Sequence, residues 1–115
     1  MNFIMRIIVT SIVAFGLSYI LRGVQIDAFT TAIVLAIVLA ILNAIVKPIL
    51  ILITFPITVV TLGLFLFVIN ALIILLADKF IKGFHVDGFW WALLFSLLLS
   101  IVTSVLYKEK SDEKE

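Results

Sequence analysis

Hydrophobic residues fill most of the chain in long runs, and the few charged residues stand between those runs. A helix needs about 20 mostly apolar residues to cross a bilayer. Four runs approach this length, at residues 3–21, 28–46, 62–77 and 89–106. The first carries one charge, Arg6, and because more apolar runs follow we interpret it as a retained span rather than a signal peptide. The pattern predicts an all-α, polytopic membrane protein with four transmembrane helices.

The apolar segment at residues 47–63 departs from this pattern because it contains Pro48 and Pro56. Proline lacks a backbone donor and disfavours helix in the residue before it. The segment is also too short to cross the bilayer and return. Two alternatives remain open. Either the second helix continues past Lys47 with a kink, or this segment lies in the interface or enters the bilayer as a re-entrant stretch.

Two loops have closely similar sequences. "GVQIDAFTTA", residues 23–32, is matched at an offset of 60 by "GFHVDGFWWA", residues 83–92. Small residues recur every four positions in the two runs that follow, at Ala28, Ala32, Ala36, Ala40 and Ala44 and at Gly88, Ala92, Ser96, Ser100 and Ser104. We interpret residues 1–107 as one transmembrane domain of two repeated helical hairpins, residues 3–47 and 63–107. A pseudo-two-fold axis along the membrane normal would relate them.

These two ladders of small residues also predict helix packing. In lipid no hydrophobic force drives helices together, so small side chains matter because they let backbones approach closely. The ladders are equivalent in the two halves, so we predict that the second and fourth spans cross near Ala36 and Ser96, at the centre of the bundle. The alternative is that both ladders face outward and serve self-association.

Two amide side chains, Asn43 and Asn70, lie inside predicted spans. An unpaired amide in lipid is costly. Both lie in the half of the membrane nearer Lys47, so we predict that they approach one another or share a polar partner. The alternative is that they line a permeation path.

The repeated loops carry candidates for local structural roles. Asp27 and Asp87 directly precede apolar runs, where a carboxylate can cap the first amides of a helix. Trp90 and Trp91 begin the fourth span, where aromatic residues anchor a helix in the headgroup region. Lys47 is expected to anchor the opposite interface.

Composition excludes several classes of function. The chain is 65% hydrophobic and 13% charged, with a mean hydropathy of +1.41, which a soluble domain of this size cannot bury. The net charge of +1 argues against a nucleic-acid partner. The sequence has no cysteine, no nucleophile with an adjacent base and no phosphate-binding loop. We therefore expect no enzymatic activity, no cofactor and no metal, and the lipid bilayer is the predicted environment.

Basic residues predict the orientation. With four spans, five basic residues fall on the side of the termini, against three on the opposite side: Arg6, Lys47, Lys108, Lys110 and Lys114 against Arg22, Lys79 and Lys82. This bias favours cytoplasmic termini. The final segment, residues 108–115, has alternating charges and is predicted to be a disordered tail.

The stretch "LNAIVKPILILITFPITVVTLGLFLFVINAL", followed by "GFHVDGFWWALL", resembles the small four-span bacterial proteins of phage holin superfamily IV, also called YvlD-like proteins. The resemblance covers residues 3–106. It implies a protein of the bacterial plasma (inner) membrane, linked in many members with envelope stress. It implies no proven lysis activity and provides no catalytic residues.

We therefore expect a protein that acts by association within the membrane, as a homo-oligomer or with an envelope protein partner. One alternative is a true holin that forms membrane lesions. Another is a subunit of a small channel or transporter.

Overall fold

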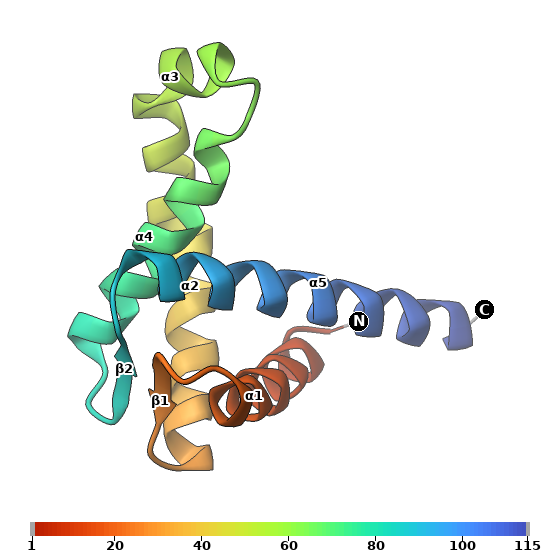
Figure 1. Cartoon of the computed structure of the whole chain (residues 1–115). Helices are drawn as coiled ribbons and strands as arrows, with labels where there is room; N and C mark the ends of the chain where they lie inside the picture. Colours follow the sequence, from red (N-terminus) through yellow and green to blue (C-terminus); the bar gives the residue numbers. More distant parts are fainter. Residues whose placement is uncertain (1, 115) are drawn as a thin grey trace.

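The computed structural model describes the backbone of residues 2–114 and the side chains of residues 2–107. This part of the chain is mostly helical (Figure 1). Its elements follow in the order α1 (Phe3–Ile20), β1 (Val24–Ile26), α2 (Phe29–Ile53), α3 (Phe55–Val60), α4 (Phe65–Phe80), β2 (Phe84–Val86) and α5 (Phe89–Lys114).

Three of the helices described are long and apolar enough to cross a membrane. They are α1, α2 and the part of α5 from Phe89 to Tyr107. The predicted third span forms α4, which has 16 residues and is shorter than the other three. It begins at Phe65 rather than Leu62, because Leu62 and Gly63 both have positive φ and so interrupt the helix.

The prediction of an all-α fold is wrong at the two repeated loops, because these pair as a two-stranded antiparallel ribbon. The register joins Val24 to Val86, Gln25 to His85 and Ile26 to Phe84. In each strand the outer two side chains are buried and the middle one is exposed. Each loop supplies the hydrogen-bond partners that the backbone of the other needs when its side chains are buried.

The pairing of the loops continues beyond the strands. The backbone N–H of Asp27 donates to the carbonyl of Gly83 over 2.9 Å, and that of Asp87 donates to the carbonyl of Gly23 over 2.7 Å. The ribbon and these two bonds hold the ends of four helices together.

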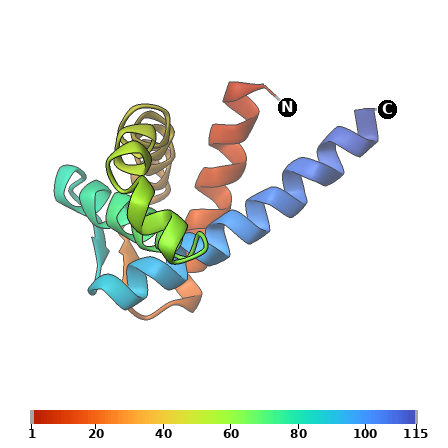
Figure 2. The same cartoon turned by 90° about the horizontal axis from the view of Figure 1, so that it is seen from above.

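The helices are arranged around the ribbon so that α1 and α4 each pack against both α2 and α5. In Figure 1, α2 and α4 run side by side to α3, while α1 and α5 run in another direction to the termini. Seen from above, α1 and α5 move apart toward the two ends of the chain (Figure 2). The helices are therefore closest at the ribbon.

The predicted crossing of the second and fourth spans is wrong, because α2 and α5 do not contact each other anywhere in the described chain. Ala36 and Ser96 are nevertheless buried, at 3% and 6% exposure. Because α1 and α4 each pack against both of these helices, they keep α2 and α5 apart.

The buried core lies near the ribbon and repeats at an offset of 60 residues. Its largest completely buried side chains include Leu35 and Phe95, which are separated by this offset. The other buried pairs with the same spacing are Ser11 and Ala71, Ala14 and Ile74, Leu17 and Ala77, Leu21 and Ile81, Val24 and Phe84, Ile26 and Val86, Ala32 and Ala92, Ala36 and Ser96, and Leu39 and Leu99.

The proline-containing segment divides into two parts. As far as Ile53 it continues α2, with Pro48 inside the helix. Residues 55–60 then form α3, which has Pro56 in its first turn, where a missing N–H has no intrahelical partner to lose. None of the six described residues of α3 is buried. The first alternative therefore holds up to Ile53, and the interfacial or re-entrant reading of the rest stays a prediction.

The backbone of α5 continues as a helix through Lys114, over most of the segment for which a disordered tail was predicted. The side chains of residues 108–115 lie outside the part that the structure describes. They include Lys108, Lys110 and Lys114, which the prediction of orientation counted.

Candidate functional site

A cavity of about 560 Å³ opens between α1, α2 and α5, on the side of the chain termini. Its wall combines polar and apolar side chains from three helices. They are Phe3, Arg6, Ile7 and Thr10 from α1, Ala36, Leu39, Ala40, Asn43 and Ala44 from α2, and Leu99, Ser100, Thr103, Ser104 and Tyr107 from α5.

The cavity lies where the small residues of the two ladders are exposed. Near the ribbon, neighbouring side chains cover the same ladders. Ala32 and Ala92, near the ribbon, have no exposed surface. Farther along the same helices, Ala44 and Ser104 are exposed and line the cavity. The ladders therefore form core where the helices converge and cavity wall where they diverge.

A short polar network joins α1 to α5 at the cavity mouth. The Thr10 and Tyr107 hydroxyls lie 2.7 Å apart, and the Tyr107 hydroxyl donates over 3.1 Å to the carbonyl of Arg6. Since that proton is used, Thr10 is the donor to Tyr107. The Arg6 guanidinium lies over the Tyr107 ring, 5.3 Å from its centroid, at cation–π distance.

Sequence reasoning did not identify Tyr107 as a site residue. A signal was present, since Tyr107 is at an offset of 60 from Lys47, the basic residue expected at the same interface. Thr10 has the same relation to Asn70.

The structure does not join the two amides that were predicted to pair. Asn43 lines the cavity, whereas Asn70 is half-buried on α4 and is not among the cavity residues. Within residues 2–107 no hydrogen bond connects their side chains, so direct pairing is not observed. The divergence of the helices leaves Asn43 facing open space rather than a neighbouring helix.

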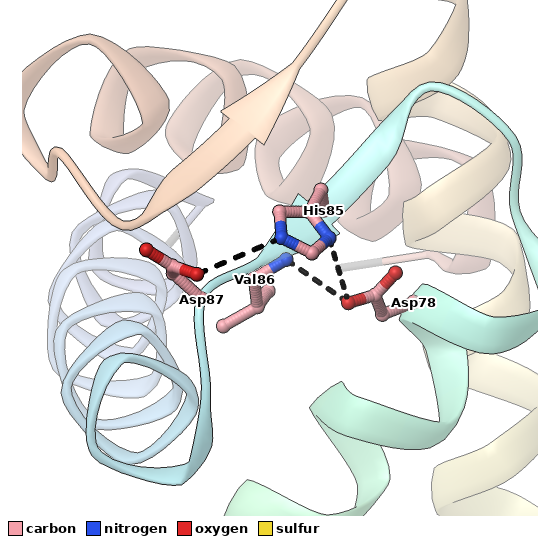
Figure 3. Close-up of polar contacts among 4 residues, drawn as sticks. All are labelled: Asp78, His85, Val86 and Asp87. Carbon is pink, nitrogen blue, oxygen red and sulfur yellow. Dashed lines mark hydrogen bonds and ion pairs between the residues drawn. The ribbon is translucent and has the colours of Figure 1, made fainter.

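A second polar cluster lies on the exposed face of the ribbon, around His85 (Figure 3). Its Nδ1 is 3.4 Å from Asp78 Oδ2 and its Nε2 is 3.8 Å from Asp87 Oδ1. The same Asp78 oxygen accepts from the backbone N–H of Val86 over 3.1 Å, which ties α4 to the ribbon. In the described residues no group of three or more His, Cys, Asp and Glu side chains could hold a metal ion.

The predicted cap role of Asp27 is wrong. The residue at the N-cap of α2 is Ala28, which makes no side-chain capping bond, while the Asp27 carboxylate accepts from the Thr31 hydroxyl. The reason is the ribbon, because it holds the Asp27 backbone against Gly83 and brings the carboxylate over that glycine.

Asp87 lies beside His85 on the corresponding position of the second loop. The residue before α5 is Gly88, with φ of 105°. Its carbonyl accepts the first helical bond, from the N–H of Ala92 over 3.0 Å.

The three predicted interface anchors differ in their surroundings. Trp90 is 76% exposed, while Trp91 is half-buried and lies over Gly23, where any side chain would collide with its ring. Trp91 therefore packs the second repeat loop onto the first. Lys47 is half-buried on α2, and its place in the interface stays a prediction.

Comparison with known proteins gives consistent matches. Residues 1–105 match the family described as Mycobacterial 4 TMS phage holin, superfamily IV. The uncharacterized membrane protein YvlD of Bacillus subtilis is 34% identical over 103 residues, which cover 89% of this chain and 87% of that protein. An uncharacterized protein of Streptomyces coelicolor is 53% identical over 64 residues, covering 52% of this chain but only 51% of that protein. No solved structure matches.

Proposed function

The chain belongs to phage holin superfamily IV, and we propose that it is a non-enzymatic protein of the bacterial plasma membrane that acts by associating within the bilayer, with further copies or with an envelope protein. One observation supports this proposal above all. The arm formed by residues 49–64, which includes α3, presents a largely exposed apolar surface, and none of the residues of α3 is buried.

The arm is unusual because it is both apolar and free of charge. No charged residue occurs between Pro48 and Ala77. Leu52, Val60 and Leu62 are 75%, 81% and 92% exposed. Such a surface requires lipid or a protein partner around it, and van der Waals packing between helices is what drives association in lipid.

The polar groups of the arm are satisfied internally. The hydroxyl of Thr54 donates to the carbonyl of Leu50, that of Thr58 to Thr54 and that of Thr61 to Thr58. Because these threonines already have backbone partners, the arm can enter an apolar contact without leaving a hydroxyl unpaired.

Cysteine cross-linking tests this proposal, since the natural chain has no cysteine. We expect a Val60→Cys variant to form disulfide-linked dimers in native membranes under mild oxidation, if the arm meets another copy. Ile20→Cys is the matched control, because Ile20 is also an apolar residue, 74% exposed, and lies at the end of α1 nearest the ribbon. Equal and weak cross-linking at both positions, with no partner cross-linked to the arm, would contradict association through the arm.

We also infer that the domain consists of two repeated helical hairpins related by a pseudo-two-fold axis. The ribbon register supports this, because Gln25 pairs with His85, its own equivalent at an offset of 60. The exchanged bonds from Asp27 and Asp87 and the repeated buried positions are what such an axis would produce.

The proposal includes cytoplasmic termini, with Lys47 on the same side. A single cysteine at position 112 should be labelled by an impermeant maleimide in opened cells but not in intact ones. Labelling from outside intact cells would reverse the proposed orientation. A role during envelope stress, implied by the family resemblance, predicts that a deletion strain is more sensitive to antibiotics that attack the envelope.

Two alternatives remain as rival proposals. A lesion-forming holin should kill the host on induction and collapse the membrane potential, as measured with a dye. A channel or transporter subunit is favoured by the polar wall of the cavity, and its flux should fall when Asn43 is replaced by Leu. Tolerance of strong expression without loss of potential supports the association proposal against the first of these.

A further inference from the structure

We propose that the cavity between α1, α2 and α5 binds an anionic phospholipid from the leaflet nearest the chain termini. The phosphate would lie at Arg6 and an acyl chain would lie against Leu39 and Leu99. This inference goes beyond the proposed association, which concerns the arm, and it stands or falls separately.

The cavity carries a positive charge at Arg6. Arg6 is the one charged side chain among the described residues that line the cavity. Within residues 2–107 no carboxylate lies at ion-pair distance from it. An ionisable residue inside a membrane domain calls for a partner. The fork of guanidinium N–H groups matches phosphate oxygens.

Polar side chains surround the open space of the cavity. Asn43, Ser100 and Ser104 line the cavity, and within residues 2–107 their side chains make no hydrogen bond to the protein. Their amide and hydroxyl groups can donate to an anion. These groups and Arg6 come from three different helices that converge on one volume.

The polar network at the cavity mouth holds Arg6 in place without using the N–H groups of its guanidinium as donors. Tyr107 bonds to the Arg6 backbone carbonyl and stacks its ring under the guanidinium. Thr10 fixes the Tyr107 hydroxyl in turn. Within residues 2–107, the guanidinium N–H groups of Arg6 have no hydrogen-bond acceptor in the protein, so these residues leave them to a ligand at the cavity mouth.

The cavity also has an apolar part. Away from Arg6 the wall is formed by Ala36, Leu39 and Leu99. From Ala36 to Ala44 the cavity follows α2 for about 12 Å. Its volume of about 560 Å³ is within the usual range of ligand sites, about 300–1,000 Å³. A cationic mouth and an apolar interior fit an anionic amphiphile, and basic pockets between transmembrane helices are known to bind anionic lipid headgroups.

Native mass spectrometry of the purified full chain tests the proposal, with phosphatidylglycerol and phosphatidylcholine of identical acyl chains as probes. We expect tighter binding of phosphatidylglycerol. Arg6→Gln should weaken that binding about tenfold or more, because a hydrogen-bonded charge is lost. Arg22→Gln is the control, since Arg22 is exposed on the connection between α1 and β1, at the ribbon end, and should change nothing. Equal losses for the two variants would overturn the proposal.

A second variant keeps the test valid if Arg6→Gln proves unstable. Ala44→Phe fills the cavity mouth at an exposed position and leaves every charge in place. It should also weaken phosphatidylglycerol binding about tenfold, with helix content unchanged by circular dichroism. Unchanged lipid binding in this variant would place the lipid elsewhere on the protein and overturn the proposal.

Maleimide labelling in nanodiscs locates the bound lipid. A Ser104→Cys variant should react several-fold more slowly in phosphatidylglycerol than in phosphatidylcholine. Ile101→Cys, on the same helix but 59% exposed and outside the cavity wall, should react equally in both. Displacement of the lipid by millimolar inorganic phosphate, or disulfide dimers through the Ser104→Cys variant, would show that a soluble anion or a second copy occupies the cavity, and either result would overturn the proposal.

Discussion

At the ribbon end of the domain, Ala32 and Ala92 are completely buried, whereas farther along the same two helices Ala44 and Ser104 face the cavity. All four belong to the same four-residue ladders. The difference comes from what holds the helices together. Near the ribbon, strand pairing and two exchanged backbone bonds fix the helix ends. At the terminal end, the polar link between α1 and α5 in the described residues is the short network of Arg6, Thr10 and Tyr107.

A small residue therefore permits close helix packing but does not enforce it. Small side chains let backbones approach, but an additional constraint must bring the helices together. Here the constraint acts at one end, and the same ladders become core at that end and a cavity wall at the other. Four pairs of matched experiments test this difference between the ribbon end and the remainder of the domain.

The largest expected effect is loss of the buried ring at the ribbon end. Phe95→Ala should lower the free energy of unfolding by about 3–5 kcal/mol, because the neighbours of a fully buried ring cannot fill the space. Phe3→Ala, at a ring 62% exposed on the cavity, should cost less than about 0.5 kcal/mol. Unfolding in detergent, followed by circular dichroism, measures both. Similar losses would show that the terminal half is packed as tightly as the ribbon half.

Larger side chains in the ladders should also destabilise the ribbon end more than the terminal end, by a smaller amount than the loss of Phe95. Ala32→Leu is expected to destabilise the domain by about 1–3 kcal/mol, because the added atoms have no room. Ala44→Leu should be within about 0.5 kcal/mol of the natural protein. The same unfolding assay applies, and a cost at Ala44 matching that at Ala32 would mean that the cavity is closed in the membrane.

Two glycines with nearly the same backbone conformation allow the cost of backbone strain to be distinguished from the cost of a steric clash with a neighbouring side chain. Gly83 and Gly63 have φ of 89° and 88°. Alanine at either position should cost about 1–2 kcal/mol, because L-residues disfavour this conformation. At Gly83 a Cβ would also lie 2.5 Å from the Asp27 carboxylate, while at Gly63 nothing is within 4 Å. Gly83→Ala should therefore cost more, and adding Asp27→Ala should recover the excess. Equal costs without recovery would rule out crowding by Asp27.

The smallest expected effect concerns the link at the terminal end. A double-mutant cycle of Thr10→Val and Tyr107→Phe should give a coupling of about 0.6 kcal/mol, typical of hydrogen bonds in membranes. The matched cycle of Thr31→Val and Asp27→Asn measures a side-chain bond at the ribbon end. Strict additivity for Thr10 and Tyr107 would show that α1 and α5 are not held together by this bond.

Much of the architecture could be predicted from the sequence. The apolar runs predict α1, α2 and α5, because their length and composition suit the bilayer regardless of what they pack against. The similar sequences of the two loops and the two ladders predict that residues 60 positions apart are buried alike. The buried pairs at this offset agree with that expectation.

The candidate site was predicted only in part. Asn43 was selected because it is polar within an apolar run, and it does line the cavity. Arg6 was noted as a charge but Tyr107 was not selected, because their relation depends on how α1 lies against α5. The prediction that Asp27 caps α2 is wrong because the ribbon directs its carboxylate elsewhere. No hydrogen bond joins Asn43 to Asn70 within residues 2–107, and their predicted approach stays a prediction.

The sequence by itself determined that this is a mostly helical membrane protein, because the length and hydropathy of a segment are local properties that decide whether it suits the bilayer. Only the tertiary structure decided that the two loops pair as a ribbon, that α2 and α5 stay apart, and that the members of each ladder farthest from the ribbon line a cavity. These features depend on the angles at which helices leave the ribbon. Such angles follow from long-range backbone pairing and side-chain packing, which a pattern along one chain does not specify.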